Sequence, residues 1–188
     1  VMPSLSQTEQ EVLEAGHVGW EKELLSGDPQ WSHWRDQPVS PLTAEEQAFL
    51  EGPVEDLCAQ IDDWALSHHD RCIPKELLAY MGRTGFWSFI IPKQYGGLEF
   101  SPMAQARVIA KVASVSTACG VIVSVPNSLG PGELLLHYGT EEQKDYYLPR
   151  LARGEEIPCF ALTSPYAGSD ANALIDQGVV CHGEHEGE

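Results

Sequence analysis

The middle of the chain carries closely spaced signals that start and stop helices, and these signals limit it to a set of short helices. Two capping boxes, Thr43 with Glu46 and Thr140 with Gln143, each pair a side chain with backbone N–H groups at a helix start. Apolar residues between the signals recur with the helical period. We therefore predict about six helices with short joints between residues 43 and 154.

Prolines and glycines set the expected helix boundaries. Gly52-Pro53 predicts a break between a first and a second helix. Ser101-Pro102 predicts the start of a longer, mostly apolar helix that runs to an interruption at Pro126. Pro149 predicts a separate last turn that ends at Gly154.

The residues before this helical region differ from it in composition. Residues 1–42 are polar and punctuated by glycine and proline, and Trp20, Trp31 and Trp34 lie among them. Large aromatic side chains in a weakly structured segment usually anchor it to a surface. We interpret residues 1–42 as an N-terminal arm with one short helix over 9–25.

After the helical region the spacing of the apolar residues becomes typical of strands, at 157–163 and again at 177–183. This pattern predicts an α domain that leads into a β domain. The chain begins with Val1 and ends without a structural stop signal, so we expect a piece of a longer protein. The expected domains are an arm at 1–42, a helical domain at 43–155 and the start of a truncated β domain at 156–188.

Composition excludes several classes of function. The chain has 28 acidic and 11 basic residues and a net charge of −17, which argues against a nucleic-acid surface. The five cysteines are scattered and favour a reduced cytosolic protein. No secretory signal and no apolar run of about 18 residues is present. His182 and His185 would face opposite sides of a strand, so we expect no metal site.

The stretch CFALTSPYAGSDA, residues 159–171, joins an apolar run to a Gly-Ser turn. Gly168 permits a close backbone approach, and the N–H groups of such a turn can form an anion-binding nest. Thr163 adds a hydroxyl group that donates or accepts a hydrogen bond. A plain polar turn between two strands is the alternative, and these residues alone leave both open.

Three stretches together resemble the acyl-CoA dehydrogenase family, and in particular its large bacterial fatty acyl-CoA dehydrogenases. GFWSFIIPKQYGGLEFS at 85–101 is similar to the family's Pro-x-x-Tyr-Gly-Gly connector, and HYGTEEQKDYYLPRLARGE at 137–155 to its Tyr-Gly-Thr-Glu-Glu-Gln-Lys helix. CFALTSPYAGSDA resembles the signature Ala-Leu-Thr-Glu-Pro-x-Ala-Gly-Ser-Asp. The resemblance covers about 54 to 183 and identifies the chain as an N-terminal fragment of such a protein.

The resemblance implies a mainly α fold: the family's N-terminal helical domain, followed by the first strands of a truncated, β-barrel-like middle domain. It implies an FAD-dependent enzyme that converts fatty acyl-CoA to trans-2-enoyl-CoA in β-oxidation. An electron-transferring flavoprotein would take the electrons, and the full-length protein would form a homo-oligomer. The expected location is the cytoplasm of a bacterium, with inner-membrane association of the full-length protein as the alternative.

The resemblance also implies roles for residues that match the family's motifs. Phe160 and Leu162 would lie against the flavin ring, and Thr163 would hydrogen-bond near its N5 edge. Gly168 and Ser169 would meet the FAD pyrophosphate. The expected acyl-CoA contacts are Ser169 near the CoA portion and Val125 and Leu129 beside the acyl chain, with plain core packing of the last two as the alternative.

The chain departs from the family pattern at two positions and lacks one functional residue. Ser164 stands where the family usually has Glu, and Tyr166 is bulkier than the usual small residue. The proton-abstracting glutamate of the family is expected downstream of Glu188, so the fragment itself is expected to be inactive. Two alternatives remain: an acyl-CoA oxidase, and a non-catalytic, truncated acyl-CoA- or flavin-binding subunit.

Overall fold

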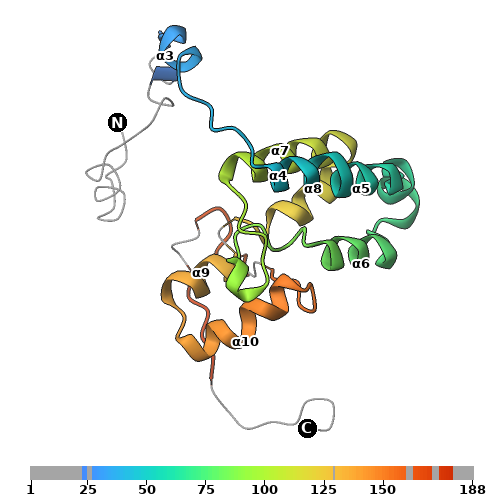
Figure 1. Ribbon diagram of the computed structural model, residues 1–188. Helices are drawn as coiled ribbons and strands as arrows, with labels where there is room; N and C mark the ends of the chain where they lie inside the picture. Colours follow the sequence, from blue (N-terminus) through green and yellow to red (C-terminus); the bar gives the residue numbers. More distant parts are fainter. Residues whose placement is uncertain (1–22, 25–26, 129, 160–162, 171–173, 180–188) are drawn as a thin grey trace. The chain divides into compact units, whose positions relative to one another are not determined.

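The computed structural model describes residues 23–24, 27–128, 130–159, 163–170 and 174–179 (Figure 1). The chain divides into two compact units, Val1–Pro41 and Leu42–Glu188. In the described part of the first unit, helix α3 spans Trp31–Arg35, and its two tryptophans are exposed. Trp20 and most of the helix predicted over 9–25 lie outside the described residues.

The described part of the second unit is built from helices, which confirms the predicted fold class (Figure 1). Contacts join α7 to α8, α5 to both α6 and α7, and α9 to α10. In chain order the elements are α4 (Ala44–Phe49), the π-helical turn η1 (Leu50–Val54), α5 (Glu55–Gln60), the π-helical turn η2 (Ala65–Asp70), α6 (Lys75–Thr84), the 3₁₀ turn η3 (Lys93–Tyr95), α7 (Pro102–Val115), α8 (Thr117–Ser124), α9 (Pro131–Tyr138) and α10 (Glu141–Ala152).

The helix starts follow the sequence signals. Both capping boxes are present: the Thr43 hydroxyl accepts from the Glu46 N–H at 3.2 Å, and the Thr140 hydroxyl accepts from the Gln143 N–H at 3.2 Å. Ser101 caps α7 and Pro102 occupies its first turn, as predicted.

Two predicted helix boundaries are wrong. Gly52-Pro53 does not break the helix, because the turn η1 carries the chain from α4 into α5. A π-helical turn is wider than an α-helical one and so accommodates a proline, which lacks the N–H group. Pro149 lies inside α10 rather than at the start of a new turn. Leu148 and Leu151 on either side of it are buried with Ile91, and this packing holds the helix together.

The long helix predicted from Pro102 to Pro126 is two helices. Ser116 is extended (φ −145°, ψ 118°), and its hydroxyl caps α8 by accepting from the Cys119 N–H at 3.4 Å. The second helix then packs closely on the first. A side chain at Gly120 would place its Cβ 2.7 Å from the Cβ of Ala113, so glycine permits this approach.

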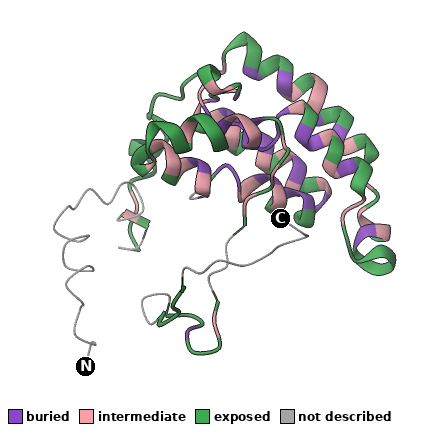
Figure 2. Ribbon diagram, turned by 90° about the horizontal axis from the view of Figure 1, so that it is seen from below, coloured by how far each residue is buried: buried purple, intermediate pink, exposed green. Residues whose placement is uncertain are grey.

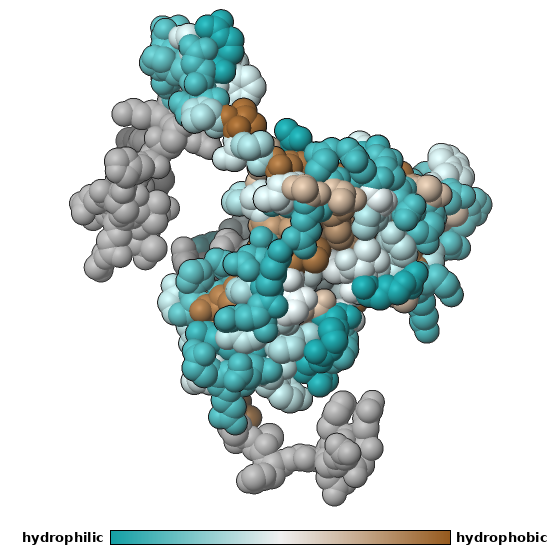
Figure 3. Space-filling view, viewed as in Figure 1, coloured by the Kyte–Doolittle hydropathy of each residue, from teal (hydrophilic) through white to brown (hydrophobic). Residues whose placement is uncertain are grey.

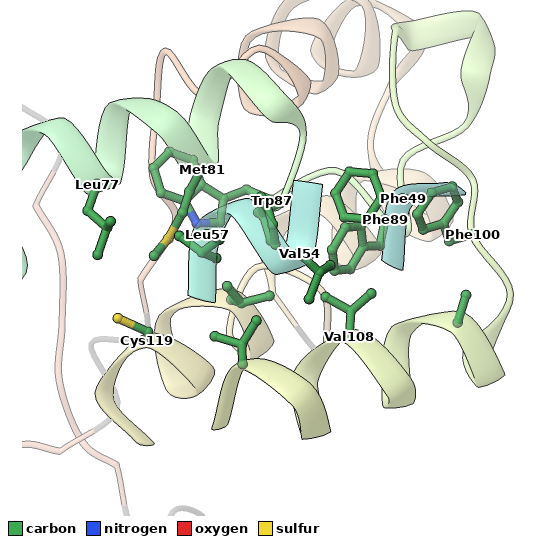
Figure 4. Close-up of a cluster of buried hydrophobic side chains, with 14 of the residues drawn as sticks. Phe49, Val54, Leu57, Leu77, Met81, Trp87, Phe89, Phe100, Val108 and Cys119 are labelled. Carbon is green, nitrogen blue, oxygen red and sulfur yellow. The ribbon is translucent and has the colours of Figure 1, made fainter. Parts of the chain in front are cut away.

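The core gathers aromatic rings from elements far apart in the sequence (Figure 4). The Phe49 ring centroid of α4 lies 5.0 Å from that of Phe86 and 5.2 Å from that of Phe100. Phe89 stacks on Phe100 at 5.6 Å. Figure 2 shows buried positions alternating with exposed ones along the helices, as amphipathic helices require. The face in Figure 3 is mostly hydrophilic over these helices.

The connector between α6 and α7 is held in the core by Asn127, which is 6% exposed. Its Oδ1 accepts from the Phe89 N–H at 2.8 Å. Its Nδ2 donates to the carbonyl oxygens of Phe86 at 2.6 Å and Val123 at 2.8 Å. One amide therefore satisfies three buried backbone groups and ties the end of α8 to the connector.

A buried carboxylate joins the starts of α4 and α7. Glu46, 4% exposed, accepts from the Thr43 N–H at 2.8 Å through Oε2 and from the Ser101 N–H at 2.6 Å through Oε1. Burial by itself would raise the pKa of Glu46, but the backbone hydrogen bonds from Thr43 and Ser101 outweigh it and lower the pKa from 4.5 to about 2.

The strands predicted at 157–163 and 177–183 are absent from their described residues, 157–159, 163 and 177–179. The remaining residues of both segments lie outside the described part. A strand needs a neighbouring strand to satisfy its backbone groups, and no described segment supplies one here. Among the described residues that follow α10, only Ser164 and Ala167 form a β-bridge.

We expect Glu46→Gln to destabilise the chain by about 1–2 kcal/mol at pH 7, because an amide nitrogen would face a backbone donor. The folded-state pKa of Glu46 lies below its unfolded value of 4.5. Its stabilisation is therefore complete above that value and is lost as the pH falls toward 2. When urea unfolding is measured from pH 7 to pH 3, the free energy of unfolding of Glu46→Gln should depend less on pH than that of the unsubstituted chain. Glu76→Gln, at an exposed position of α6, is the control, and equal effects of the two variants would contradict the assignment.

We expect Asn127→Asp to destabilise the chain by about 2–4 kcal/mol, because a carboxylate donates to neither carbonyl oxygen and brings a charge into the core. Urea unfolding at pH 7 measures this loss. Ser128→Ala is the neighbouring control, since Ser128 is exposed and donates only to the Val125 carbonyl oxygen. A loss below 0.5 kcal/mol, about the size of a surface substitution, would show that Asn127 does not hold the connector.

Candidate functional site

An apolar groove of about 470 Å³ lies between α8 and the segment that follows α10. None of the residues that line it is charged. Val121 and Val125 are one helical turn apart, so they lie on the same face of the helical path. The lining residues are Ala118, Val121, Ile122, Val125, Pro126, Ile157, Pro158 and Cys159.

The groove contains one of the two residues predicted to contact an acyl chain. Val125 is half-buried and lines it, while Leu129 lies outside the described residues. The wall that carries Val125 is fixed at both ends, since Ser116 caps α8 and Asn127 holds the residues after it. The position of Val125 is therefore set by helix geometry and by buried hydrogen bonds.

Of the residues that line the groove, only Val125 was predicted from the sequence. Val121 and Ile122 line one wall, and Ile157 and Cys159 line the other. The spacing of 118, 121, 122 and 125 is an amphipathic signal that could have identified the first wall. The second wall comes from residues more than 30 positions away, so only the fold brings the two together.

A tight turn follows the groove along the chain. The Ser164 N–H donates to the Ala167 carbonyl oxygen at 2.9 Å, and the Ala167 N–H donates back to Ser164 at 3.3 Å. The Ser164 hydroxyl accepts from the Tyr166 N–H at 3.3 Å. Ala167 is buried, whereas Thr163 and Tyr166 are exposed. Ser164, at the position where the family usually has Glu, thus serves the turn itself.

Nothing within the described part of the chain requires a glycine at position 168. A Cβ there would meet no atom within 4 Å, and the backbone is not in the left-handed region. Gly168 and Ser169 are both exposed, and no hydrogen bond from either backbone N–H is found among the described residues. The turn thus presents open space and free donors to a ligand. Phe160 and Leu162 lie outside the described residues.

The described residues contain no group of three or more His, Cys, Asp or Glu side chains arranged to hold a metal ion. Among the helices described, none is both long enough and apolar enough to span a membrane.

Residues 43–155 match the family described as Acyl-CoA dehydrogenase, N-terminal domain. This match covers more than half of the chain, so the chain belongs to the acyl-CoA dehydrogenase family. The family resemblance and the helical fold class predicted from the sequence are both confirmed. FAD is the cofactor of this family, which confirms the predicted cofactor at the level of the family.

Individual relatives carry several functions. An Acyl-CoA dehydrogenase of Bacillus subtilis is 38% identical over 60% of this chain and 29% of its own length. The Caffeyl-CoA reductase-Etf complex subunit CarC of Acetobacterium woodii is 43% identical over 56% of this chain and 28% of its own. An acyl-CoA dehydrogenase from Bacillus anthracis, solved in complex with FAD, superposes with a TM-score of 0.62 at 26% identity, covering 74% of this chain and 24% of that one.

The chain therefore spans less than one third of the length of each of these relatives. The match to the family model falls on the helical region, residues 43–155.

Proposed function

We propose that this chain is the N-terminal part of an FAD-dependent acyl-CoA dehydrogenase that converts fatty acyl-CoA to trans-2-enoyl-CoA in fatty acid β-oxidation. One observation carries the proposal: an uncharged groove on α8 is followed directly along the chain by a turn with open space at Gly168. An apolar chain and an anionic cofactor are the two ligand types that these features accept.

The groove would hold the acyl chain. Val125 lines it, and its neighbours Val121 and Ile157 are partly exposed, so they would lose contact with water when the chain binds. Leu129 is proposed to extend this wall. Ser169 would lie near the CoA portion, where an exposed hydroxyl can donate to a phosphate or an amide.

The turn fits FAD. Gly168 and Ser169 would hold the pyrophosphate through backbone N–H groups that have no other partner among the described residues. Thr163 is exposed, so its hydroxyl is accessible to donate near the flavin N5 edge, and Phe160 and Leu162 would pack on the ring. When bound, FAD supplies the acceptor for the hydride that leaves Cβ of the substrate.

The remaining parts of the enzyme would come from outside these 188 residues. The proton-abstracting glutamate would lie beyond Glu188, so the chain alone would bind but not turn over substrate. An electron-transferring flavoprotein would accept the electrons, which is supported by a relative named as a subunit of a reductase-Etf complex. The complete protein would form a homo-oligomer in the bacterial cytoplasm, with inner-membrane association as the alternative.

Three other functions are alternatives. A reductase, in which the same hydrogens move in the opposite direction, is supported by a relative named as a caffeyl-CoA reductase subunit, 43% identical over 28% of its length. An acyl-CoA oxidase would pass electrons to oxygen, and a non-catalytic acyl-CoA- or flavin-binding subunit would pass none.

The intact protein that carries this chain should reduce the dye ferrocenium when a saturated acyl-CoA is added, because electrons stored on the flavin need an acceptor. Enoyl-CoA formation is followed by its absorbance. Oxygen consumption without the dye would instead indicate an oxidase. Reduction of enoyl-CoA by the chemically reduced protein, without the forward reaction, would indicate a reductase, and bound acyl-CoA with no reaction would indicate a binding subunit.

Gly168→Val should lower the FAD affinity of the intact protein at least tenfold while leaving its stability within about 0.5 kcal/mol. A Cβ at position 168 meets no atom of the described chain within 4 Å, so a loss of affinity would indicate the space that the cofactor needs. Fluorescence of released flavin during dialysis measures the affinity. Gly178→Val is the matched control, since a Cβ there also meets nothing within 4 Å. Equal FAD affinity in both variants would remove Gly168 from the site.

A further inference from the structure

The turn before Gly168 fixes the backbone of Tyr166. The Tyr166 N–H donates to the Ser164 hydroxyl at 3.3 Å, and Ser164 and Ala167 exchange two backbone hydrogen bonds at 2.9 and 3.3 Å. Ala167 is 4% exposed and anchors this turn. A serine hydroxyl that bonds to the backbone two residues on is a local device that stabilises such turns. The position from which the Tyr166 ring projects is therefore set by the chain itself.

The ring of Tyr166 is open to a ligand. The residue is 77% exposed, and within the described part of the chain its ring neither packs on another aromatic ring nor lies under a cation. By contrast, the exposed ring of Trp64 lies 3.9 Å from that of His68. A flat aromatic ring left in water is stabilised when another flat ring covers it.

The position of Tyr166 in the chain places this ring beside the proposed phosphate contacts. Gly168 follows two residues later, a distance of at most about 7 Å along an extended chain. FAD and CoA both contain adenosine diphosphate, in which one ribose separates the pyrophosphate from adenine. A ring at position 166 is therefore within reach of an adenine whose phosphates bind at Gly168 and Ser169.

We propose that Tyr166 stacks on the adenine ring of the adenosine diphosphate group that FAD and CoA share. This inference rests on the proposed function, because it adds a contact to the same ligand site. The small residue that the family usually has at this position offers no such ring. Stacking of a base on an aromatic side chain changes affinity by about 5- to 150-fold.

The test compares ligands with and without adenine on the intact protein. Equilibrium dialysis measures the affinity for FAD and for FMN, and isothermal titration calorimetry on the FAD-loaded protein measures that for CoA and for 4′-phosphopantetheine. FMN and 4′-phosphopantetheine each keep one phosphate but lack the adenosine. None of these measurements depends on turnover.

We expect Tyr166→Ala to weaken FAD, CoA or both at least fivefold, and to change FMN and 4′-phosphopantetheine less than twofold. Tyr166→Phe keeps the ring, so it should bind all four compounds within twofold of the unsubstituted protein. Tyr138→Ala is the matched control, since Tyr138 is an equally exposed tyrosine at the end of α9. It should change none of the four affinities.

The compound that loses affinity identifies the source of the adenine. A loss with FAD alone assigns Tyr166 to the cofactor, and a loss with CoA alone assigns it to the substrate; either result supports the stack. Unchanged affinities in Tyr166→Ala would overturn the inference. So would an equal loss with the compounds that lack adenine, or a Tyr166→Phe variant as weak as Tyr166→Ala.

The same measurements separate this inference from the proposed reaction. If Tyr166→Ala loses only the ligands with adenine but the unsubstituted protein neither oxidises acyl-CoA nor reduces enoyl-CoA, the adenine contact stands and the reaction is wrong. If the protein oxidises acyl-CoA and Tyr166→Ala binds all four compounds normally, the reaction stands and the adenine contact is wrong. An unsubstituted protein that binds neither FAD nor CoA would overturn both.

Discussion

The need to satisfy the buried backbone of the connector between α6 and α7 governs much of this structure. The connector passes through the aromatic core without regular secondary structure over most of its length, so its polar groups need partners from elsewhere. Asn127, three residues after the end of α8, supplies two of these hydrogen bonds, to Phe86 and Phe89, and a third to Val123 in α8. The same amide thereby fixes the end of α8 and the position of its apolar face.

The candidate site depends on that constraint. The groove has one wall on α8 and another on residues 157–159, and the chain continues from the second wall into the turn around Gly168. Glu46 adds a second link by joining the starts of α4 and α7, and α7 is the helix on which α8 packs. Buried hydrogen bonds and close helix packing, rather than a long helix, therefore position the apolar wall.

The sequence predicted the helix starts at Thr43, Ser101 and Thr140 because capping is local: each cap pairs groups only three residues apart. The predictions from the sequence were wrong for features that depend on packing between residues distant in the chain. Pro149 lies within a helix because its neighbours are buried against Ile91, and the predicted strands lack a described pairing partner. For the candidate site, the motif resemblance predicted Val125, which lines the groove, and Gly168, whose role stays a prediction, whereas the opposite wall of the groove had no local signal.

The amino-acid sequence by itself determined the helical class of this chain, its family and the places where most helices begin, since periodicity, caps and motif residues act over short separations. The tertiary structure alone decided that Ser116 divides one apolar run into two packed helices, that Glu46 serves two helix starts, and that Val121 faces Ile157 across a groove. These features depend on contacts between residues that are distant in sequence, and such contacts form only when the whole core is assembled.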